Sequence, residues 1–322
     1  MSTRSGLTLA LAAAAISGFA VYTNSYGVRA FGNATIYTTA KNLVAAVVLA
    51  AALAAVTYRT RRRASLRHAN SPHVADSRPA HSPLTWPHGI TQWAGLAAVA
   101  VVGGSVPFLL FFNGLARVSS ANAAFIQKTL VVWVALLAVP LLRERLTWWH
   151  VAAIGGLVWG QALLGGGIEG IGLGVGEVMI FGATVLWAVE TVVARKLLRD
   201  LPALTVGTAR MGGGVVILIG YAFVTTGWPA LTATSWHQWS WAIATGVILA
   251  AYVATWYAAL ARAGAIDVTA LLVPGAIITA LLQAGSTSIA AQWFGLTVVA
   301  AAAALIPLAA RRSNRGSLAG AP

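Results

Sequence analysis

Four ionisable side chains stand inside long apolar stretches of this 322-residue sequence. They are Lys41, Lys128, Glu190 and Arg210. An ionisable group inside a membrane costs roughly 3 kcal/mol or more, so each of the four is a candidate for binding or coupling. A cation suits an anionic or carboxylate-bearing solute, whereas a carboxyl group suits proton transfer.

The two lysines are expected to lie in the outer half of the membrane. A rise of about 1.5 Å per residue places Lys41 roughly 8 Å and Lys128 roughly 10 Å below the outer face. With their neighbours Asn42 and Gln127 they are predicted to form an electropositive substrate-binding vestibule. The alternative for Lys41 is an ammonium group that extends to the outer headgroups.

Glu190 and Arg210 are expected in the inner half of the membrane, where two interpretations remain open. They could form a buried ion pair that fixes the packing of two helices. Glu190 could instead be a proton-coupling carboxylate that Arg210 modulates.

Three aromatic residues, Trp187, Tyr252 and Trp256, are predicted to line the same cavity and to bind substrate. Tyr252 and Trp256 are four residues apart and therefore share one face of a helix. The alternative is the interfacial belt, where tryptophan and tyrosine also gather.

The elements that position these residues are membrane-spanning helices. Hydrophobic residues make up 58% of the chain, charged residues only 9%, and the mean hydropathy is +0.78. This composition excludes a soluble globular domain, which carries about 25% charged residues. About 20 apolar residues cross a bilayer. We predict an all-α integral membrane protein with ten transmembrane helices at 6–24, 36–57, 88–113, 121–140, 149–165, 177–194, 204–226, 239–260, 268–288 and 293–310.

The charges sort by side once these spans are drawn. The net charge is +14, and most of the 21 Lys and Arg residues fall in alternate connections. Arg29 and Arg117 are the two that fall on the other side. The positive-inside rule therefore predicts a multi-pass protein of the cytoplasmic membrane with both termini cytoplasmic. The excess of cations then reflects the orientation of the chain in the membrane, because the positive charges mark its cytoplasmic connections. No nucleic-acid partner is expected.

The longest connection, 58–87, is predicted to be a solvated cytoplasmic linker between the second and third spans. It contains three of the six histidines and His88 directly follows it, but the spacing of these four fits no zinc site. Its arginines could contact anionic lipid headgroups, so membrane lipids are expected partners. The chain has no cysteine, and we expect neither a metal nor a cofactor.

The two halves of the chain are related by short ungapped similarities. A shift of 169 residues places Lys41 on Arg210, and a shift of 145 places Lys128 on Val273. Each half would contain five spans, so the second half is predicted to be inverted in the membrane, as in many transporters. The predicted repeats are 1–170, which includes the linker, and 171–322.

Several stretches also resemble a known family. They are residues 115–124, 143–147, 186–188, 194–198, 209–211 and 256–260. Together they are similar to the ten-helix EamA-type transporters of the drug/metabolite transporter superfamily. The resemblance implies a central cavity between spans 1–4 and 6–9, with spans 5 and 10 at the periphery. The chain departs from the family pattern at Ser17-Gly18-Phe19, at Lys128-Thr129-Leu130 and in 283–292, which contains no acid.

The sequence predicts a secondary active transporter of a small metabolite that works by alternating access, and not an enzyme. Proton coupling or solute exchange would drive it, and export is favoured over import. The alternatives are a flippase for lipids or lipid-linked sugars, or a non-transporting membrane partner; a membrane-embedded lipid-modifying enzyme is a weaker one. Gly156 and Gly160 form a small-residue pair that could serve a homodimer.

Overall fold

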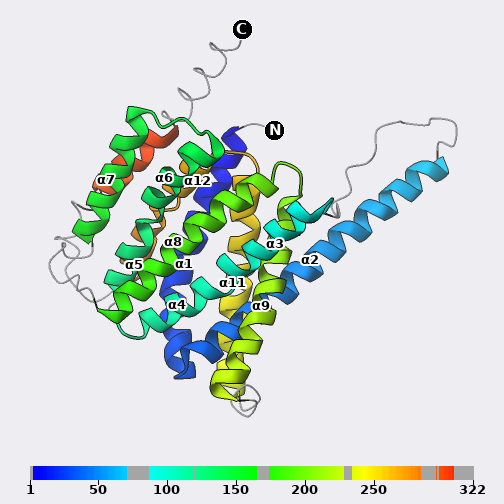
Figure 1. Ribbon diagram of the computed structural model, residues 1–322, viewed down its shortest axis with the longest axis horizontal. Helices are drawn as coiled ribbons and strands as arrows, with labels where there is room; N and C mark the ends of the chain where they lie inside the picture. The colour runs from blue at the N-terminus through cyan, green and yellow to red at the C-terminus, as the bar shows by residue number, and fades with distance from the viewer. Residues whose placement is uncertain are drawn as a thin grey trace, which may run out of the picture.

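The computed structural model is helical throughout its described part, which comprises residues 3–70, 87–118, 120–164, 174–227, 234–283, 295 and 297–307. The chain runs up and down through a bundle of long helices (Figure 1). The helices are α1 (Thr3–Phe31), α2 (Ala34–Asn70), α3 (Ile90–Val102), α4 (Val106–Leu115), α5 (Ser120–Lys128), α6 (Leu130–Leu142), α7 (Trp148–Leu164), α8 (Val175–Leu197), α9 (Ala203–Thr226), α11 (Trp236–Leu260), α12 (Ala265–Ala270) and α13 (Gly275–Gln283).

Seven helical segments of the described chain are long and apolar enough to cross a membrane. Two of them contain a break, because α3 and α4 form one segment and the last residues of α5, from Phe125, join α6 in another. The remaining predicted spans correspond to shorter elements, namely α7, the α12–α13 pair and the helix Thr297–Pro307. The count of ten transmembrane helices therefore stays a prediction.

The predicted linker differs from the structure at its start. Residues 58–70 continue α2 as helix, well beyond the predicted end of the second span at 57. Arginine and alanine are good helix formers, so hydropathy marks where the membrane ends but not where the helix ends. This extension projects beyond the rest of the bundle at the right of Figure 1. Residues 71–86 lie outside the described part.

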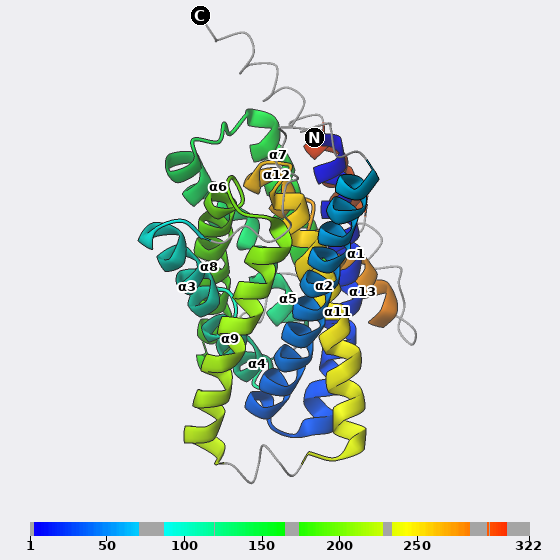
Figure 2. The same cartoon turned by 90° about the vertical axis from the view of Figure 1, so that its right-hand side faces the viewer.

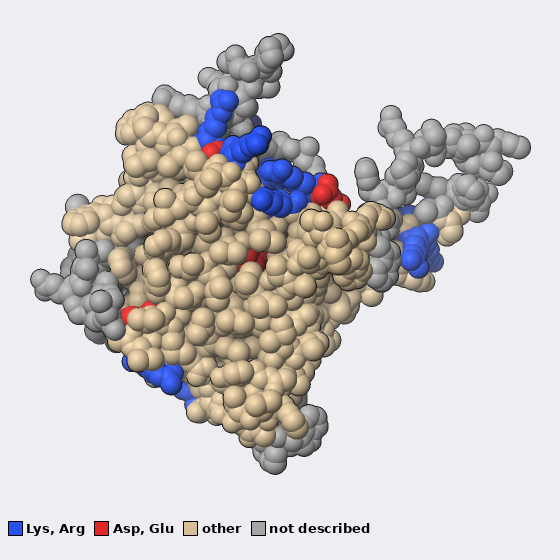
Figure 3. Space-filling model, viewed as in Figure 1, with Lys and Arg blue, Asp and Glu red and all other residues tan. Residues whose placement is uncertain are grey.

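Basic residues gather at one end of the bundle, which is named the basic end here. It is where α1 begins and where α6, α8 and α11 end, and both views place these ends together (Figures 1 and 2). Figure 3 shows Lys and Arg along this edge, a smaller group at the opposite end and a band without Lys or Arg between them. The exposed or half-buried cations at the basic end include Arg4, Arg143, Arg145, Arg195, Lys196, Arg199 and Arg262.

Helix boundaries repeat along the chain with the predicted spacings. The start of α2 and the start of α9 are 169 residues apart, at Ala34 and Ala203. Three further boundaries are 145 residues apart: the ends of α4 and α11, the starts of α5 and α12, and the starts of α6 and α13. The start of α1 lies at the basic end, where α8 finishes, so these two helices run in opposite directions (Figure 1). These coincidences support the inverted repeat, which stays a prediction.

The glycine pair of α7 faces another helix of the same chain. A Cβ on Gly156 would lie 2.9 Å from Ala302, and one on Gly160 would lie 2.7 Å from Val299. Small residues let helices approach closely in a membrane. The pair therefore packs α7 against Thr297–Pro307 at the edge of the bundle, and the predicted homodimer has no support from it.

Candidate functional site

A cavity of about 110 Å³ lies between the two predicted repeats. Its wall is mostly apolar, with a few polar groups that converge on one space, which is the usual composition of a small-molecule site. Residues from α1, α2, α4, α5, α6, α8, α9, α11 and α12 contribute to it. Helices far apart in sequence therefore build one site.

Eight of the nine predicted site residues line this cavity. They are Lys41, Gln127, Lys128, Trp187, Glu190, Arg210, Tyr252 and Trp256. Asn42 does not line it, because its side-chain amide donates to the carbonyl of Thr38 one turn earlier in α2. The rings of Tyr252 and Trp256 stack with centroids 5.9 Å apart, as their shared helix face predicts.

Lys41 is 2% exposed and is held by a neutral polar partner and by aromatic rings. Its Nζ donates to Asn24 Oδ1 of α1 at 3.1 Å. The same nitrogen lies 4.0 Å from the ring centroid of Phe112 and 5.6 Å from that of Phe108, both in α4. The cation therefore points into the bundle and does not extend to the headgroups.

Lys128 ends α5 just before the helix is interrupted at Thr129. Its side chain is buried, and among the described residues no hydrogen bond or ion pair reaches its Nζ. The adjacent Gln127 Oε1 is also buried without a hydrogen-bond partner. Buried polar groups are almost always paired, so an acceptor and a donor are available here for a solute.

Glu190 of α8 is paired with two residues from other helices. Its Oε1 accepts a hydrogen bond from the hydroxyl of Tyr257 in α11 and lies 3.9 Å from Arg210 Nε of α9. All three side chains are buried. Because this ion pair is too long for a hydrogen bond, the Nε–H group of Arg210 has no hydrogen-bond partner.

The ring of Phe108 lies near both of the cations that the predicted repeat relates. Arg210 Cζ is 5.4 Å and Lys41 Nζ is 5.6 Å from its centroid. Because an aromatic face attracts cations, Phe108 stabilises both and keeps them on one wall of the cavity. Trp187 packs edge-on against Phe108 and donates from its indole N–H to the carbonyl of Gly103 at 3.3 Å.

The break between α3 and α4 permits this arrangement because it contains two glycines. A Cβ on Gly103 would collide with Glu190, and one on Gly104 would collide with the backbone oxygen of Arg210. A Cβ on Gly214 of α9 would in turn meet the backbone of Gly104. Backbone contact at this point brings α9 close to the end of α3, and Arg210 lies near the ring of Phe108 at the start of α4.

Glu177, the acid nearest in predicted depth to the two lysines, forms no described ion pair with them. Its carboxylate lies beside Gly174 at the start of its own helix. No group of three or more His, Asp or Glu side chains that could hold a metal occurs in the described ranges.

The comparisons with known proteins identify a family. The EamA-like transporter family matches this chain twice, over residues 76–166 and 174–308. Chains of solved structures also match, and one described only as "Crystal structure of protein" aligns with a TM-score of 0.68. That alignment covers 94% of this chain and 98% of the other at 18% identity, which shows a shared fold. None of the curated proteins compared with this chain matches it.

Proposed function

Because this chain belongs to the EamA-like transporter family, we propose that it carries a small carboxylate-bearing metabolite across the membrane by alternating access. The family and the apolar helices make it an integral membrane protein of a class that transports small solutes. We further propose an anionic substrate, coupling to protons or to solute exchange, and export as the favoured direction. In this mechanism the two repeats rock around the shared cavity.

The charge of the cavity supports an anionic solute, and the observation that carries the proposal is Lys128. Three cations and one acid line the same space. Lys41 has a neutral partner and Arg210 has Glu190, whereas Lys128 is buried with no described partner. A buried ammonium group without a counterion is costly, and a carboxylate from the solute would remove that cost. Gln127 Oε1 would accept from a hydroxyl or amino group of the same solute.

Glu190 is proposed as the coupling group. A solute carboxylate that approached Arg210 would compete with Glu190 for this cation. The 3.9 Å ion pair with Arg210 is the weaker of the two contacts of Glu190, the other being the hydrogen bond from Tyr257. Glu190 could then take up a proton while Tyr257 keeps it in place. Binding of the anion and of the proton would thus support each other, and the driving force would be a proton gradient or exchange.

The proposed orientation places the basic end in the cytoplasm. The cations at this end support it through the positive-inside rule. A proton that binds together with the anion would drive import along an inward proton gradient, so export, which remains the favoured direction, would be driven by solute exchange.

The test is transport by the purified protein in liposomes. A thermal-shift screen of carboxylates would first find a solute that stabilises the protein, and uptake of that solute would follow. Lys128→Gln is expected to lower uptake at least tenfold, because the solute loses its counterion. Lys196→Gln, an exposed lysine at the basic end, is the matched control. Equal uptake by both variants would reject the carboxylate site.

A second arm tests the coupling. Uptake is measured with and without a pH gradient in Glu190→Gln. We expect exchange to persist and acceleration by the gradient to disappear. Acceleration that survives in Glu190→Gln would rule out the coupling role.

A further inference from the structure

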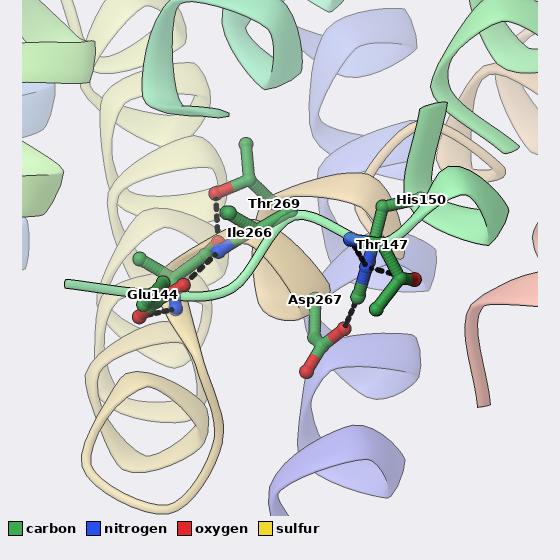
Figure 4. A network of polar contacts seen from close by, with 7 residues as sticks. Glu144, Thr147, His150, Ile266, Asp267 and Thr269 are labelled. Atoms are coloured by element: carbon green, nitrogen blue, oxygen red, sulfur yellow. Dashed lines mark hydrogen bonds and ion pairs between the residues drawn. The ribbon is translucent and has the colours of Figure 1, made fainter. Parts of the chain in front are cut away.

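A polar network lies at the basic end, outside the cavity, and joins the two predicted repeats. It links the connection between α6 and α7 to the start of α12 (Figure 4). The residues that make it are Glu144, Thr147 and His150 on one side and Ala265, Ile266 and Asp267 on the other. The function proposed above uses none of them.

Glu144 closes the start of α12 with both of its carboxylate oxygens. Its Oε1 accepts from the backbone N–H of Ala265 at 2.7 Å, and its Oε2 from that of Ile266 at 3.0 Å. The residue before α12 is Gly264, which has no side chain to do this. The first N–H groups of a helix need acceptors, so α12 takes them from a residue more than 100 positions away.

His150 forms the second link. The backbone N–H of Thr147 donates to His150 Nδ1 at 3.1 Å, so Nδ1 is the unprotonated nitrogen of the ring. The proton of the neutral imidazole is then on Nε2, which donates to Asp267 Oδ1 at 3.0 Å. His150 is 3% exposed and Asp267 is 9% exposed. A hydrogen bond to a carboxylate in such surroundings is among the stronger kinds.

Two arginines complete the arrangement. Arg143 adopts a φ of 56°, in the left-handed region that favours glycine, and this conformation turns the chain from α6 toward α12. Strained backbone of this kind persists only where surrounding contacts hold it. Arg195 at the end of α8 donates to the carbonyl of Leu260, and its charge interacts favourably with that of Glu144.

The segment that this network holds is also a wall of the cavity. Thr269 lies within α12, and Leu272 and Val273 follow it closely; all three line the cavity. Movement of α12 away from the α6–α7 connection would therefore change access to the cavity from the basic end. The start of α5 is 145 residues earlier than that of α12, and the predicted inverted repeat places it at the other end of the bundle. The position equivalent to Glu144 is Ile289, outside the described residues, and 284–294 contains no acid.

We propose that Glu144, with the His150–Asp267 pair, forms a gate that holds the basic end of the cavity closed in the solute-free protein. The gate opens when the α6–α7 connection separates from α12. This inference rests on the proposed alternating-access function, but its test requires no substrate.

Because the chain has no cysteine, a single introduced thiol is the only site that a maleimide labels, and its labelling rate reports how accessible the cavity is. Thr191→Cys places one thiol on the cavity wall in α8, and Ala20→Cys places one in α1. Each reporter is labelled with a membrane-impermeant maleimide, in vesicles that expose either the basic end or the opposite end. The rates are compared in the cysteine reporters alone and after addition of Glu144→Gln or Asp267→Asn. Glu177→Gln, an acid at the opposite end, is the matched control.

We expect Glu144→Gln to raise the labelling rate of the Thr191→Cys reporter from the basic end about tenfold, and to lower that of the Ala20→Cys reporter from the opposite end. Asp267→Asn should act in the same direction with a smaller effect. His150→Gln, which keeps a side-chain N–H donor, serves as the milder variant if either of these fails to fold. Rates in the gate variants within twofold of the Glu177→Gln control would overturn the gate. Faster labelling from both ends would also overturn it, because that outcome indicates general loosening.

The two proposals fail in different ways. If labelling shifts as expected but no carboxylate is transported, the gate stands and the proposed substrate falls. If Lys128→Gln abolishes uptake while the labelling rates do not respond to Glu144→Gln, the transport function stands and the gate falls.

Discussion

Lys41 in α2 and Arg210 in α9 occupy equivalent positions under the predicted repeat, yet their surroundings differ. Both cations lie over the ring of Phe108. Lys41 is paired with the neutral amide of Asn24, whereas Arg210 faces the carboxylate of Glu190. One half of the chain thus offers a cation without an acid, and the other half offers an ion pair. The comparison teaches that a repeated position can be kept for its charge while its partner, and therefore its task, changes.

The largest effect on this comparison is expected from Glu190→Leu. The substitution leaves Arg210 buried without a counterion, and breaking a buried pair from one side costs about 3–5 kcal/mol. Unfolding of the detergent-solubilised protein by heat or denaturant would measure the loss. Glu177→Leu, at the start of the same helix, should stay within about 0.5 kcal/mol of the parent. A loss at Glu190 no larger than that would mean that the pair does not matter for stability.

A smaller loss is expected from Tyr257→Phe. The change removes the hydroxyl that donates to Glu190, and a hydrogen bond to a charged group contributes about 1.5–3 kcal/mol. Tyr252→Phe is the control on the same helix, because no hydrogen bond of its hydroxyl occurs among the described contacts. The same unfolding assay applies, and equal losses in the two variants would show that the hydroxyl of Tyr257 has no special part.

Phe108→Leu tests the element that the two cations share. It removes two cation–aromatic contacts with long centroid distances of 5.6 and 5.4 Å. At the lower end of the usual range each contributes about 0.5–1 kcal/mol, so we expect a loss of about 1–2 kcal/mol. In combination with Lys41→Met or with Arg210→Met the losses should be less than additive. Phe112→Leu should be non-additive with Lys41→Met alone, since its ring faces only that cation. If the stability losses of Phe108→Leu added fully to those of Lys41→Met and of Arg210→Met, the two cations would not share the ring of Phe108.

The smallest effect on stability is expected from Lys41→Met. Since no described acid depends on Lys41, the free energy of unfolding should change by less than about 1 kcal/mol, and even a gain is compatible with removing a buried charge. Uptake of an anionic solute should nevertheless fall. A loss of stability as large as that of Glu190→Leu would remove the difference between the two halves.

The seven long apolar segments could be predicted because each is a long run of mostly apolar residues. The extension of α2 to Asn70 could not, since its arginines are polar enough to suggest a loop although they favour helix. The sequence also does not predict the helix breaks at Gly103–Ser105, between α3 and α4, and at Thr129, between α5 and α6. They depend on contacts with other helices, such as those of Gly104 with α9, which sequence alone does not specify.

The intramembrane charges could be located from the sequence, because an ionisable residue in an apolar run is conspicuous. Their partners could not all be named. Tyr257 directly follows Trp256 in an aromatic stretch, but nothing in the sequence joins its hydroxyl to Glu190. The prediction for Asn42 rests on its position next to Lys41, but adjacent helical residues point to different faces, and its amide bonds within α2. Glu144 stands in a connection, so its bonds to α12 required the folded chain.

The extension of α2 converts a small rotation between the two halves of the chain into a larger displacement at its far end. Residues 58–70 add about 20 Å of helix at about 1.5 Å per residue, and they continue the same helix that carries Lys41. α2 packs on α9 and α11 of the other half of the chain. A tilt of about 10° between the halves would therefore move the far end of the extension by about 3.5 Å, by the same geometry. A change too small to see at the cavity would be amplified along the extension, where a spectroscopic label can report it.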